Sequence, residues 1–227
     1  MENININIRS KGSTREFVYR TVRDQIINWE IKPGQKISEK EISDSLNVSR
    51  TPVREAFLQL AQEDLLEIYP QIGTVVSKID FTLVEEARFV REKIERAIVR
   101  DLCSFISEDF IFEMETNLTM QDLCIHKGTN QRLFELDESF HRHLFKESKK
   151  LRTWIFISSM TGHFDRLRVL QLASKTDWNL IVNQHKEIFN CILNKDPEGA
   201  EKVMGSHLEL VNLEKEALKL SHANYFK

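Results

Sequence analysis

Glycine, proline and cysteine are all scarce in this sequence. Seven Gly and four Pro in 227 residues are few for an all-β sandwich or barrel, whose many turns use both residue types, so the composition favours helices. The three cysteines, Cys103, Cys124 and Cys191, are odd in number and widely spaced. This spacing fits neither a disulfide framework nor a cysteine-based zinc site, which indicates a reducing cytosol.

Long apolar runs and a strong excess of one charge are also missing. No apolar run approaches the ~18 residues that a membrane span needs, and the first residues, MENININIRS, lack the apolar stretch of a signal peptide. We therefore expect a cytoplasmic protein with no membrane contact. The formal net charge of −3 excludes a strongly basic coat protein but leaves room for a local basic patch.

The sequence changes character near Asp80. With 41% hydrophobic residues, the chain can bury a core, and its length allows one large domain or two modest ones. Residues 1–79 show three short helices and a hairpin, whereas residues 80–227 show long helical periodicities. We predict a mainly α protein with an N-terminal domain at 1–79 and an antiparallel all-α bundle of about six helices at 80–227. The bundle helices are expected at about 82–104, 108–126, 130–147, 150–172, 177–194 and 197–221.

Local signals place the elements of the first domain. A helix from Thr14 to about Trp29 is followed by a turn at 32–35. Ser38 and Glu41 match a capping box, in which each side chain bonds the other residue's backbone amide, so a second helix starts there. A third helix opens within 49–52, where Pro52 is tolerated because first-turn amides lack helical partners. Residues 65–69 and 74–78 then read as a hairpin.

Capping signals also mark two starts in the bundle. Thr82 and Glu85 match a second capping box. Asp196 and Pro197 match an N-cap followed by proline at the first helical position. Both signals support helix starts at these places.

The third helix offers hydrogen-bond donors that suit nucleic acid. Its first turns carry Arg50, Thr51 and Arg54, and arginine forks match guanine edges or phosphates. The positive end of the helix dipole also favours an anionic backbone, and the hairpin, with Gly73 at its turn, would lie against the neighbouring groove as a wing. From the spacing alone, a DNA reader and a small helical domain with ordinary solvated arginines are equally compatible with the pattern.

The residues from Pro33 to Ala56 are a more specific signal than the spacing of the arginines alone. With the core VSRTPVREA at 48–56, they closely resemble the winged helix-turn-helix of the GntR-type bacterial regulators. The resemblance continues through the wing at 73–76, and Asp64 stands where relatives commonly have Gly. By this resemblance the first domain binds DNA. The residues expected to contact DNA are Lys40, Ser49, Arg50, Thr51, Arg54 and Gly73.

Histidines distinguish the second domain. His185 and His207 have only apolar neighbours three and four positions away, which puts both on buried helix faces. His141 lies one helical turn after Asp137, and the later residues of its face are apolar. Three imidazoles and one carboxylate are therefore predicted to point into the core from three helices. His143 is expected in solvent, and His163 is ambiguous.

A buried carboxylate needs a positive partner, and a divalent cation would satisfy Asp137. Asp137 and His141, four positions apart on one helix, can grip one ion together. Histidine with carboxylate suits Zn²⁺, our first choice, and Ni²⁺ or Mn²⁺ as alternatives, but suits Ca²⁺ and Mg²⁺ poorly. The competing interpretation is a set of hydrogen-bonded core histidines, one of them salt-bridged to Asp137.

The same positions resemble a known domain. The motifs LDESFH at 136–141, HKEI at 185–188 and MGSHL at 204–208 are similar to the effector-binding helical domain of the FadR branch of GntR regulators, called the FCD domain. Its metal-binding members use one Asp and three His at these places. The resemblance implies that the metal ligands are Asp137, His141, His185 and His207. It also implies that Arg91, on the first bundle helix, helps to hold an anionic effector.

These expectations combine into a transcription regulator and not an enzyme. Its operator binding would respond to a small organic acid bound at the metal. We expect a homodimer on a palindromic operator in double-stranded DNA, because one small head buries too little DNA for strong specificity. Two alternatives stay open. One is a hydrolase-like metalloenzyme that uses the same four ligands to activate water, and the other is a metal-free regulator whose histidines bond the acid directly.

Overall fold

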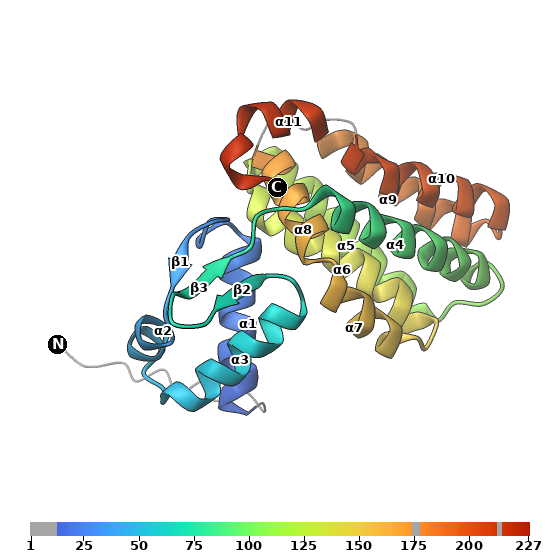
Figure 1. Ribbon diagram of the computed structural model, residues 1–227. Helices are drawn as coiled ribbons and strands as arrows, with labels where there is room; N and C mark the ends of the chain where they lie inside the picture. The colour runs from blue at the N-terminus through green and yellow to red at the C-terminus, as the bar shows by residue number, and fades with distance from the viewer. Residues whose placement is uncertain (1–12, 174–177, 213–214) are drawn as a thin grey trace. The chain divides into compact units, whose positions relative to one another are not determined.

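The computed structural model describes residues 13–173, 178–212 and 215–227 (Figure 1). The chain divides into two compact units, one that ends at Lys78 and one that begins at Ile79. The start of the predicted helix 177–194 and positions 213–214 of the predicted helix 197–221 lie outside the described residues.

The N-terminal unit is a winged helix-turn-helix, as predicted. Its three strands form one antiparallel sheet in the order β1-β3-β2, and the two-residue strand β1 is the part that the sequence pattern missed. A helical face of α1 packs against α3 and buries Val18, Val22, Val53 and Phe57. The elements are α1 (Thr14–Ile27), β1 (Lys36–Ile37), α2 (Glu39–Leu46), α3 (Arg50–Gln62), β2 (Leu66–Tyr69) and β3 (Gly73–Val76).

The turns of this unit follow from local chemistry. Ser38 and Glu41 form the expected capping box at the start of α2, each side chain accepting from the other residue's amide. Asn47 ends α2 in the left-handed region, a conformation that asparagine tolerates. Asp64 also has a positive φ, of 57°, which explains why glycine would suit that position. The strain falls on the turn before the wing and leaves the fold unchanged.

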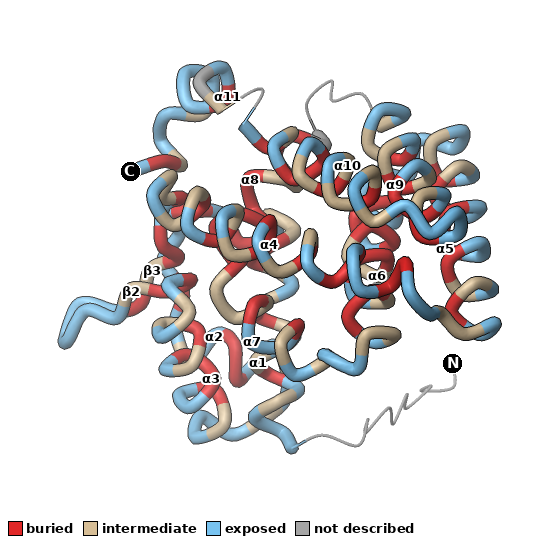
Figure 2. The backbone as a smooth tube through the Cα atoms, turned by 90° about the vertical axis from the view of Figure 1, so that its right-hand side faces the viewer, coloured by how far each residue is buried: buried red, intermediate tan, exposed pale blue. Residues whose placement is uncertain are grey.

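The C-terminal unit is an all-helical bundle. Helix α4 packs against α10, α8 and α6, while α5 packs against α6 and α9. Figure 2 shows buried and exposed stretches alternating along these helices, as amphipathic periodicity requires. The elements are α4 (Phe81–Leu102), α5 (Glu108–Lys127), α6 (Asn130–Glu147), α7 (Leu151–Met160), α8 (Gly162–Ala173), α9 (Trp178–Leu193), α10 (Pro197–Glu209), η1 (Leu210–Asn212), α11 (Lys215–Ser221) and η2 (Ala223–Tyr225).

Two predicted helices are interrupted. The helix expected at 150–172 breaks at Thr161, because this buried hydroxyl bonds both Ser158 O and the Asp165 carboxylate and so starts a new helix at Gly162. The helix expected at 197–221 ends at Glu209 and continues as the 3₁₀ turn η1. Apolar periodicity does not reveal these breaks, because the face that it marks stays buried on both sides of each one.

One of the two capping signals in the bundle was wrong. Helix α4 begins at Phe81, and its N-cap is Asp80, whose carboxylate accepts from Thr82 N at 2.9 Å. Glu85 instead bonds Arg88 at 3.0 Å, so the predicted Thr82–Glu85 box does not form. The Asp196 cap with Pro197 at the helix start is confirmed. Within the described residues, no helix combines the length and apolar character needed to cross a bilayer.

Residues 225–227 fasten the start of the C-terminal unit. Ile79 N donates to Tyr225 O at 2.8 Å, and Lys227 N donates to Ile79 O at 3.0 Å. Between these bonds Phe226, 4% exposed, stacks on Phe81 with ring centroids 4.9 Å apart. The segment thus pairs with the first residues of the C-terminal unit and covers the start of α4.

Replacing Phe226 by alanine is expected to lower the free energy of unfolding by about 2 kcal/mol, because the stacked ring is lost and the segment relaxes only in part. Urea unfolding followed by circular dichroism measures this change. The control is Phe105→Ala, since Phe105 is 79% exposed and its loss should cost less than about 0.5 kcal/mol. Equal costs for the two variants would show that the segment does not stabilise the bundle.

Candidate functional site

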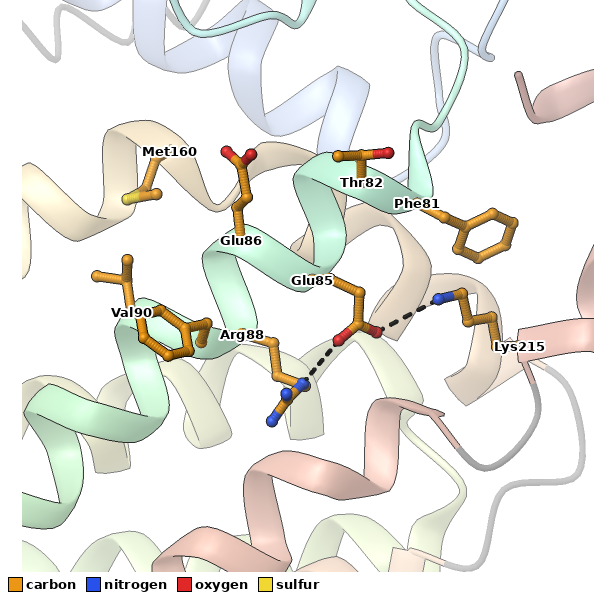
Figure 3. Close-up of a pocket in the computed structure, with 9 residues that line it drawn as sticks. Phe81, Thr82, Glu85, Glu86, Arg88, Val90, Met160 and Lys215 are labelled. Atoms are coloured by element: carbon orange, nitrogen blue, oxygen red, sulfur yellow. Dashed lines mark hydrogen bonds and ion pairs between the residues drawn. The ribbon is translucent and has the colours of Figure 1, made fainter.

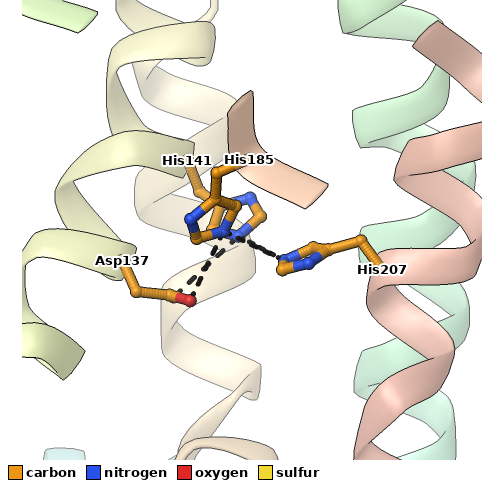
Figure 4. Close-up of side chains that lie close together, drawn as sticks. All are labelled: Asp137, His141, His185 and His207. Atoms are coloured by element: carbon orange, nitrogen blue, oxygen red, sulfur yellow. Dashed lines mark hydrogen bonds and ion pairs between the residues drawn. The ribbon is translucent and has the colours of Figure 1, made fainter. Parts of the chain in front are cut away.

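The four predicted ligands meet inside the bundle. Asp137 and His141 come from α6, His185 from α9 and His207 from α10 (Figure 4). All four are buried, and one ligand atom from each lies within 4.8 Å of the others. Two residues one turn apart on α6 therefore form a single cluster with one residue from α9 and one from α10.

The imidazoles face one another through the same nitrogen. His207 Nε2 lies 3.2 Å from His141 Nε2 and 3.3 Å from His185 Nε2. The Asp137 carboxylate completes the cluster, with Oδ1 at 3.5 Å from His185 Nε2 and Oδ2 at 3.9 Å from His141 Nε2. What these nitrogens can do depends on where each ring carries its proton.

A chain of amides fixes the proton on His185. Asn117 Nδ2 donates to the backbone carbonyl of Leu136 at 2.9 Å, which fixes the orientation of that amide because a carbonyl only accepts. Asn117 Oδ1 then accepts from Gln121 Nε2 at 2.6 Å, and this leaves Gln121 Oε1 to accept from His185 Nδ1 at 2.8 Å. His185 therefore carries its proton on Nδ1, and its Nε2 presents a lone pair to the cluster.

The other two rings have the same arrangement. His141 Nδ1 bonds the Glu95 carboxylate at 2.5 Å, and His207 Nδ1 bonds Gln184 Oε1 at 3.2 Å. Burial lowers the pKa of His185 to about 3 and, helped by the neighbouring histidines, takes the pKa of His207 well below its usual value. His185 and His207 are therefore neutral at pH 7, and their Nε2 lone pairs face each other 3.3 Å apart with no proton between them.

Such a cluster fits a metal cation. Imidazole rings that donate from Nδ1 to an oxygen are the usual arrangement of metal-bound histidines, because the outer hydrogen bond orients the ring and raises its basicity. The carboxylate and imidazole donor set suits Zn²⁺, Ni²⁺ or Mn²⁺. The structure therefore supports a buried Asp/His₃ group that could bind a divalent metal.

Arg168 is the partner of Asp137 that the sequence did not indicate. It lies on α8, donates from Nη2 to Asp137 Oδ2, and bonds Glu138 from Nη1 at 2.6 Å. Although burial raises the pKa of Asp137, Arg168 and the histidines together hold it below its usual value. The carboxylate therefore stays charged without a metal, and the positive partner that its burial requires is an arginine, which neither of the two sequence interpretations named.

Arg91 lies beside this cluster on α4 and is 1% exposed. Its Nε donates to Glu95 Oε1 at 2.7 Å, and its Nη1 lies 3.6 Å from Glu138 Oε1. Burial raises the pKa of Glu95, but Arg91 and His141 outweigh it and lower that pKa to about 2. Among the described residues, the buried Arg91 Nη2 has no hydrogen-bond partner, so this side chain keeps donor capacity for a further acceptor.

A separate hollow lies along the first turns of α4, with Met160 and Lys215 also lining it (Figure 3). It has a volume of about 710 Å³, and none of the four clustered side chains lines it. Glu85 crosses it and bonds both Arg88 at 3.0 Å and Lys215 at 3.3 Å. This ion-pair bridge ties the start of α4 to α11 and does not resemble a ligand site.

Two other histidines lie elsewhere. His143, expected in solvent, is partly buried with Nε2 3.9 Å from Glu113, and burial lowers its pKa. The ambiguous His163 is 2% exposed, and its Nδ1 accepts from Asp80 N at 2.9 Å. Neither belongs to the cluster of four.

The residues expected to contact DNA are all exposed on the N-terminal unit. Arg50, Thr51 and Arg54 lie in the first turns of α3, opposite its buried face. Ser49 is the N-cap of α3, yet its side chain makes no capping bond. The hydroxyl would normally bond the amide of the third helical residue, but that residue is Pro52, which has no N–H. The remaining two are Lys40 in the first turn of α2 and Gly73, with a φ of 127°, at the wing.

Comparison with known proteins decides the family. The model of the bacterial regulatory proteins of the gntR family matches residues 14–76, and the model of the FCD domain matches residues 86–210. The chain belongs to the GntR family. The FCD domain, which covers more than half of the chain, is consistent with the FadR branch.

Similar proteins agree with this family. The HTH-type transcriptional repressor RspR of Escherichia coli (strain K12) is 33% identical over 209 residues, which is 92% of each chain. An HTH-type transcriptional regulator in an unstable DNA locus of Streptomyces ambofaciens is 35% identical over 207 residues, 89% of this chain and 86% of the other.

Solved structures share the fold of this GntR protein. Escherichia coli McbR/YncC superposes with a TM-score of 0.78 at 18% identity, over 90% of this chain and 99% of the other. A GntR regulator from Rhodococcus sp. RHA1 gives 0.74 at 21% identity, over 93% and 99%. These structures confirm the predicted winged helix-turn-helix and helical bundle. The family and its named relatives confirm the prediction of a DNA-binding transcription regulator rather than an enzyme.

Proposed function

We propose that this GntR regulator represses transcription and that a small organic acid, bound at a transition-metal centre in its FCD domain, controls its hold on the operator. The metal is zinc, with nickel or manganese as alternatives. The regulator acts in the cytoplasm as a homodimer on a palindromic operator. Repression is supported by relatives named as repressors, namely RspR and the gluconate operon repressor of Bacillus subtilis.

One observation carries the metal part of this proposal. His141 Nε2 and His185 Nε2 lie 3.2 Å and 3.3 Å from His207 Nε2. The Nδ1 atom of each ring is bonded to a side-chain oxygen. A core of hydrogen-bonded histidines would place a donor opposite each acceptor. Here the Nε2 acceptors of His185 and His207 face each other beside a carboxylate, and a cation is what satisfies them together.

The residues around the cluster have distinct tasks. A metal ion held there supplies a Lewis-acidic centre that accepts a carboxylate oxygen. Arg168 keeps Asp137 ionised and fixed in place, and Glu95 orients both His141 and Arg91. The unpartnered Nη2 of Arg91 is then available to bind a second oxygen of the acid.

Effector binding must favour one arrangement of the protein to change its affinity for DNA. An acid that joins α4 through Arg91 to the ligand helices α6, α9 and α10 would bind most tightly where those helices are closest. The coupling free energy expected from such a difference is about 1–3 kcal/mol. The direction of the response, release or recruitment of the operator, is a result to be measured.

Elemental analysis of the purified full chain tests the proposal. We expect about one transition-metal ion per chain, lost on dialysis against a chelator and regained on adding Zn²⁺, Ni²⁺ or Mn²⁺. A chain that neither retains nor regains metal at neutral pH would support the metal-free regulator instead. The matching functional measurement compares operator binding by the metal-loaded and stripped forms across a panel of small mono- and dicarboxylates.

Replacing Arg91 by glutamine is expected to weaken the binding of the responding acid by about tenfold, because a charge-assisted bond to the carboxylate is lost. The metal content should remain unchanged, since Arg91 is not a ligand. Isothermal titration with the metal-loaded protein measures the first quantity, and elemental analysis measures the second. Arg152→Gln, a change at an exposed position of α7, is the control. An unaltered affinity in Arg91→Gln would remove Arg91 from the effector site.

A further inference from the structure

Two glutamates open α2, and they have different partners. The Glu41 carboxylate accepts from Ser38 N at 3.0 Å and completes the capping box. Glu39 reaches across to α3, where its Oε1 accepts from Arg54 Nε at 3.1 Å and its Oε2 accepts from Arg54 Nη2 at 3.3 Å. The first helix of the helix-turn-helix therefore holds an arginine of the second through a two-point contact.

This contact uses only one edge of the guanidinium group. Arginine presents five N–H donors in a rigid plane, and Glu39 takes Nε–H together with one Nη2–H. The end of the fork, formed by Nη1 and the other Nη2–H, is left for a further acceptor. Two parallel donors at that end match O6 and N7 of guanine.

The pair has little to contribute to stability. The Arg54 side chain is 69% exposed and the Glu39 side chain 31% exposed, and ion pairs in such settings have small effects on folding. Its effect on recognition is larger, because an arginine held in place loses less side-chain freedom when it meets a base. The negative charge of Glu39 beside α3 also repels phosphates, so it disfavours binding that ignores sequence.

We propose that Glu39 is a positioning residue that holds Arg54 for end-on recognition of one guanine in each half-site. This inference rests on the proposed role of α3 as the DNA reader. Glu39→Gln should loosen Arg54 and remove a negative charge from the DNA-facing side. Discrimination between operator and unrelated DNA should fall, while affinity for unrelated DNA rises. A residue that only stabilised α2 would change neither quantity.

The test uses the full-length protein and two fluorescent duplexes. One is the sequence that the wild-type protein selects from a randomised library, and the other is a scrambled duplex of the same composition. In Glu39→Gln, we expect the ratio of the two affinities to fall about threefold to tenfold. We expect the loss to concentrate at one base pair of each half-site, the same pair that becomes indifferent in Arg54→Ala.

Glu41→Gln is the matched control. It removes the same charge from the same turn of α2, and its amide oxygen can still accept from Ser38 N. We expect slightly tighter binding to both duplexes and an unchanged base-pair profile. In the double variant Glu39→Gln/Arg54→Ala, the profile should equal that of Arg54→Ala alone, because the positioning residue then has nothing to position.

The outcomes separate the two levels of the argument. If Arg54→Ala loses one base pair and Glu39→Gln keeps the wild-type profile, the positioning role is wrong and the DNA-reading role of α3 stands. If Arg54→Ala also leaves the profile unchanged, the assignment of α3 as the reader is wrong. If Glu41→Gln and Glu39→Gln behave alike, the effect is one of charge and not of positioning.

Discussion

The His185→Ala variant is expected to lose its metal, falling from about one ion per chain to a small fraction. The substitution deletes one of four ligand atoms and leaves Gln121 Oε1 without its donor. Loss of an outer hydrogen bond alone weakens metal binding about 10–100-fold, so the loss of a ligand should exceed that range. Elemental analysis of the purified full chain and competition with a coloured chelator measure the content and the affinity.

Two comparisons make this result specific. His126→Ala removes an exposed histidine of α5 and should retain the wild-type metal content. Gln121→Leu keeps all four proposed ligands but removes the acceptor that orients His185. Its metal affinity should therefore lie between those of His185→Ala and His126→Ala. Full metal content in His185→Ala would show that the ligand assignment is wrong.

The cluster of four buried side chains could be predicted from sequence because each member follows a local pattern. A histidine with apolar neighbours at i±3 and i±4 must face the core, whichever helix it packs against. The hydrogen-bond partners of these four side chains follow no such pattern. Arg168, Gln121 and Gln184 come from other helices, and only the packing of α8, α5 and α9 brings them to the site. A charged residue that is buried because of a distant partner looks in sequence like a solvated one.

The same distinction explains the errors in secondary structure. Helix starts with an adjacent acceptor, such as Ser38 and Asp196, were predicted because their chemistry is complete within four residues. The break at Thr161 depends on a buried hydroxyl bonded to Asp165, and the apolar pattern continues across it. The strand β1 has only two residues, Lys36 and Ile37, and exists because β3 pairs with it, so no alternation was available to predict it.

Replacing Arg50 by alanine is expected to weaken specific operator binding by about 1–3 kcal/mol. At one base pair of each half-site, the variant should no longer distinguish between bases. Arg50 is the first residue of α3 and is exposed, so its side chain can extend into a groove with no rearrangement of the core. Fluorescence anisotropy with the selected duplex and its single-base-pair variants measures both effects. Arg20→Ala is the control, because it removes the same charge from α1, where Arg20 pairs with Glu16.

The salt dependence distinguishes a base contact from a phosphate contact. If Arg50 reads a base, its loss should leave the slope of log affinity against log salt nearly unchanged, because no counterion release is lost with it. Lys40→Ala provides the contrast. The loss of a lysine that contacts a phosphate should reduce that slope by about one and weaken binding to all sequences alike. Should Arg50→Ala behave as Lys40→Ala does, the N-terminus of α3 would anchor the backbone, and the reading of bases would fall to Arg54 and the wing. If both variants lose affinity equally across all single-base-pair changes of the duplex, the loop around Gly73 would be the next candidate for the base contacts.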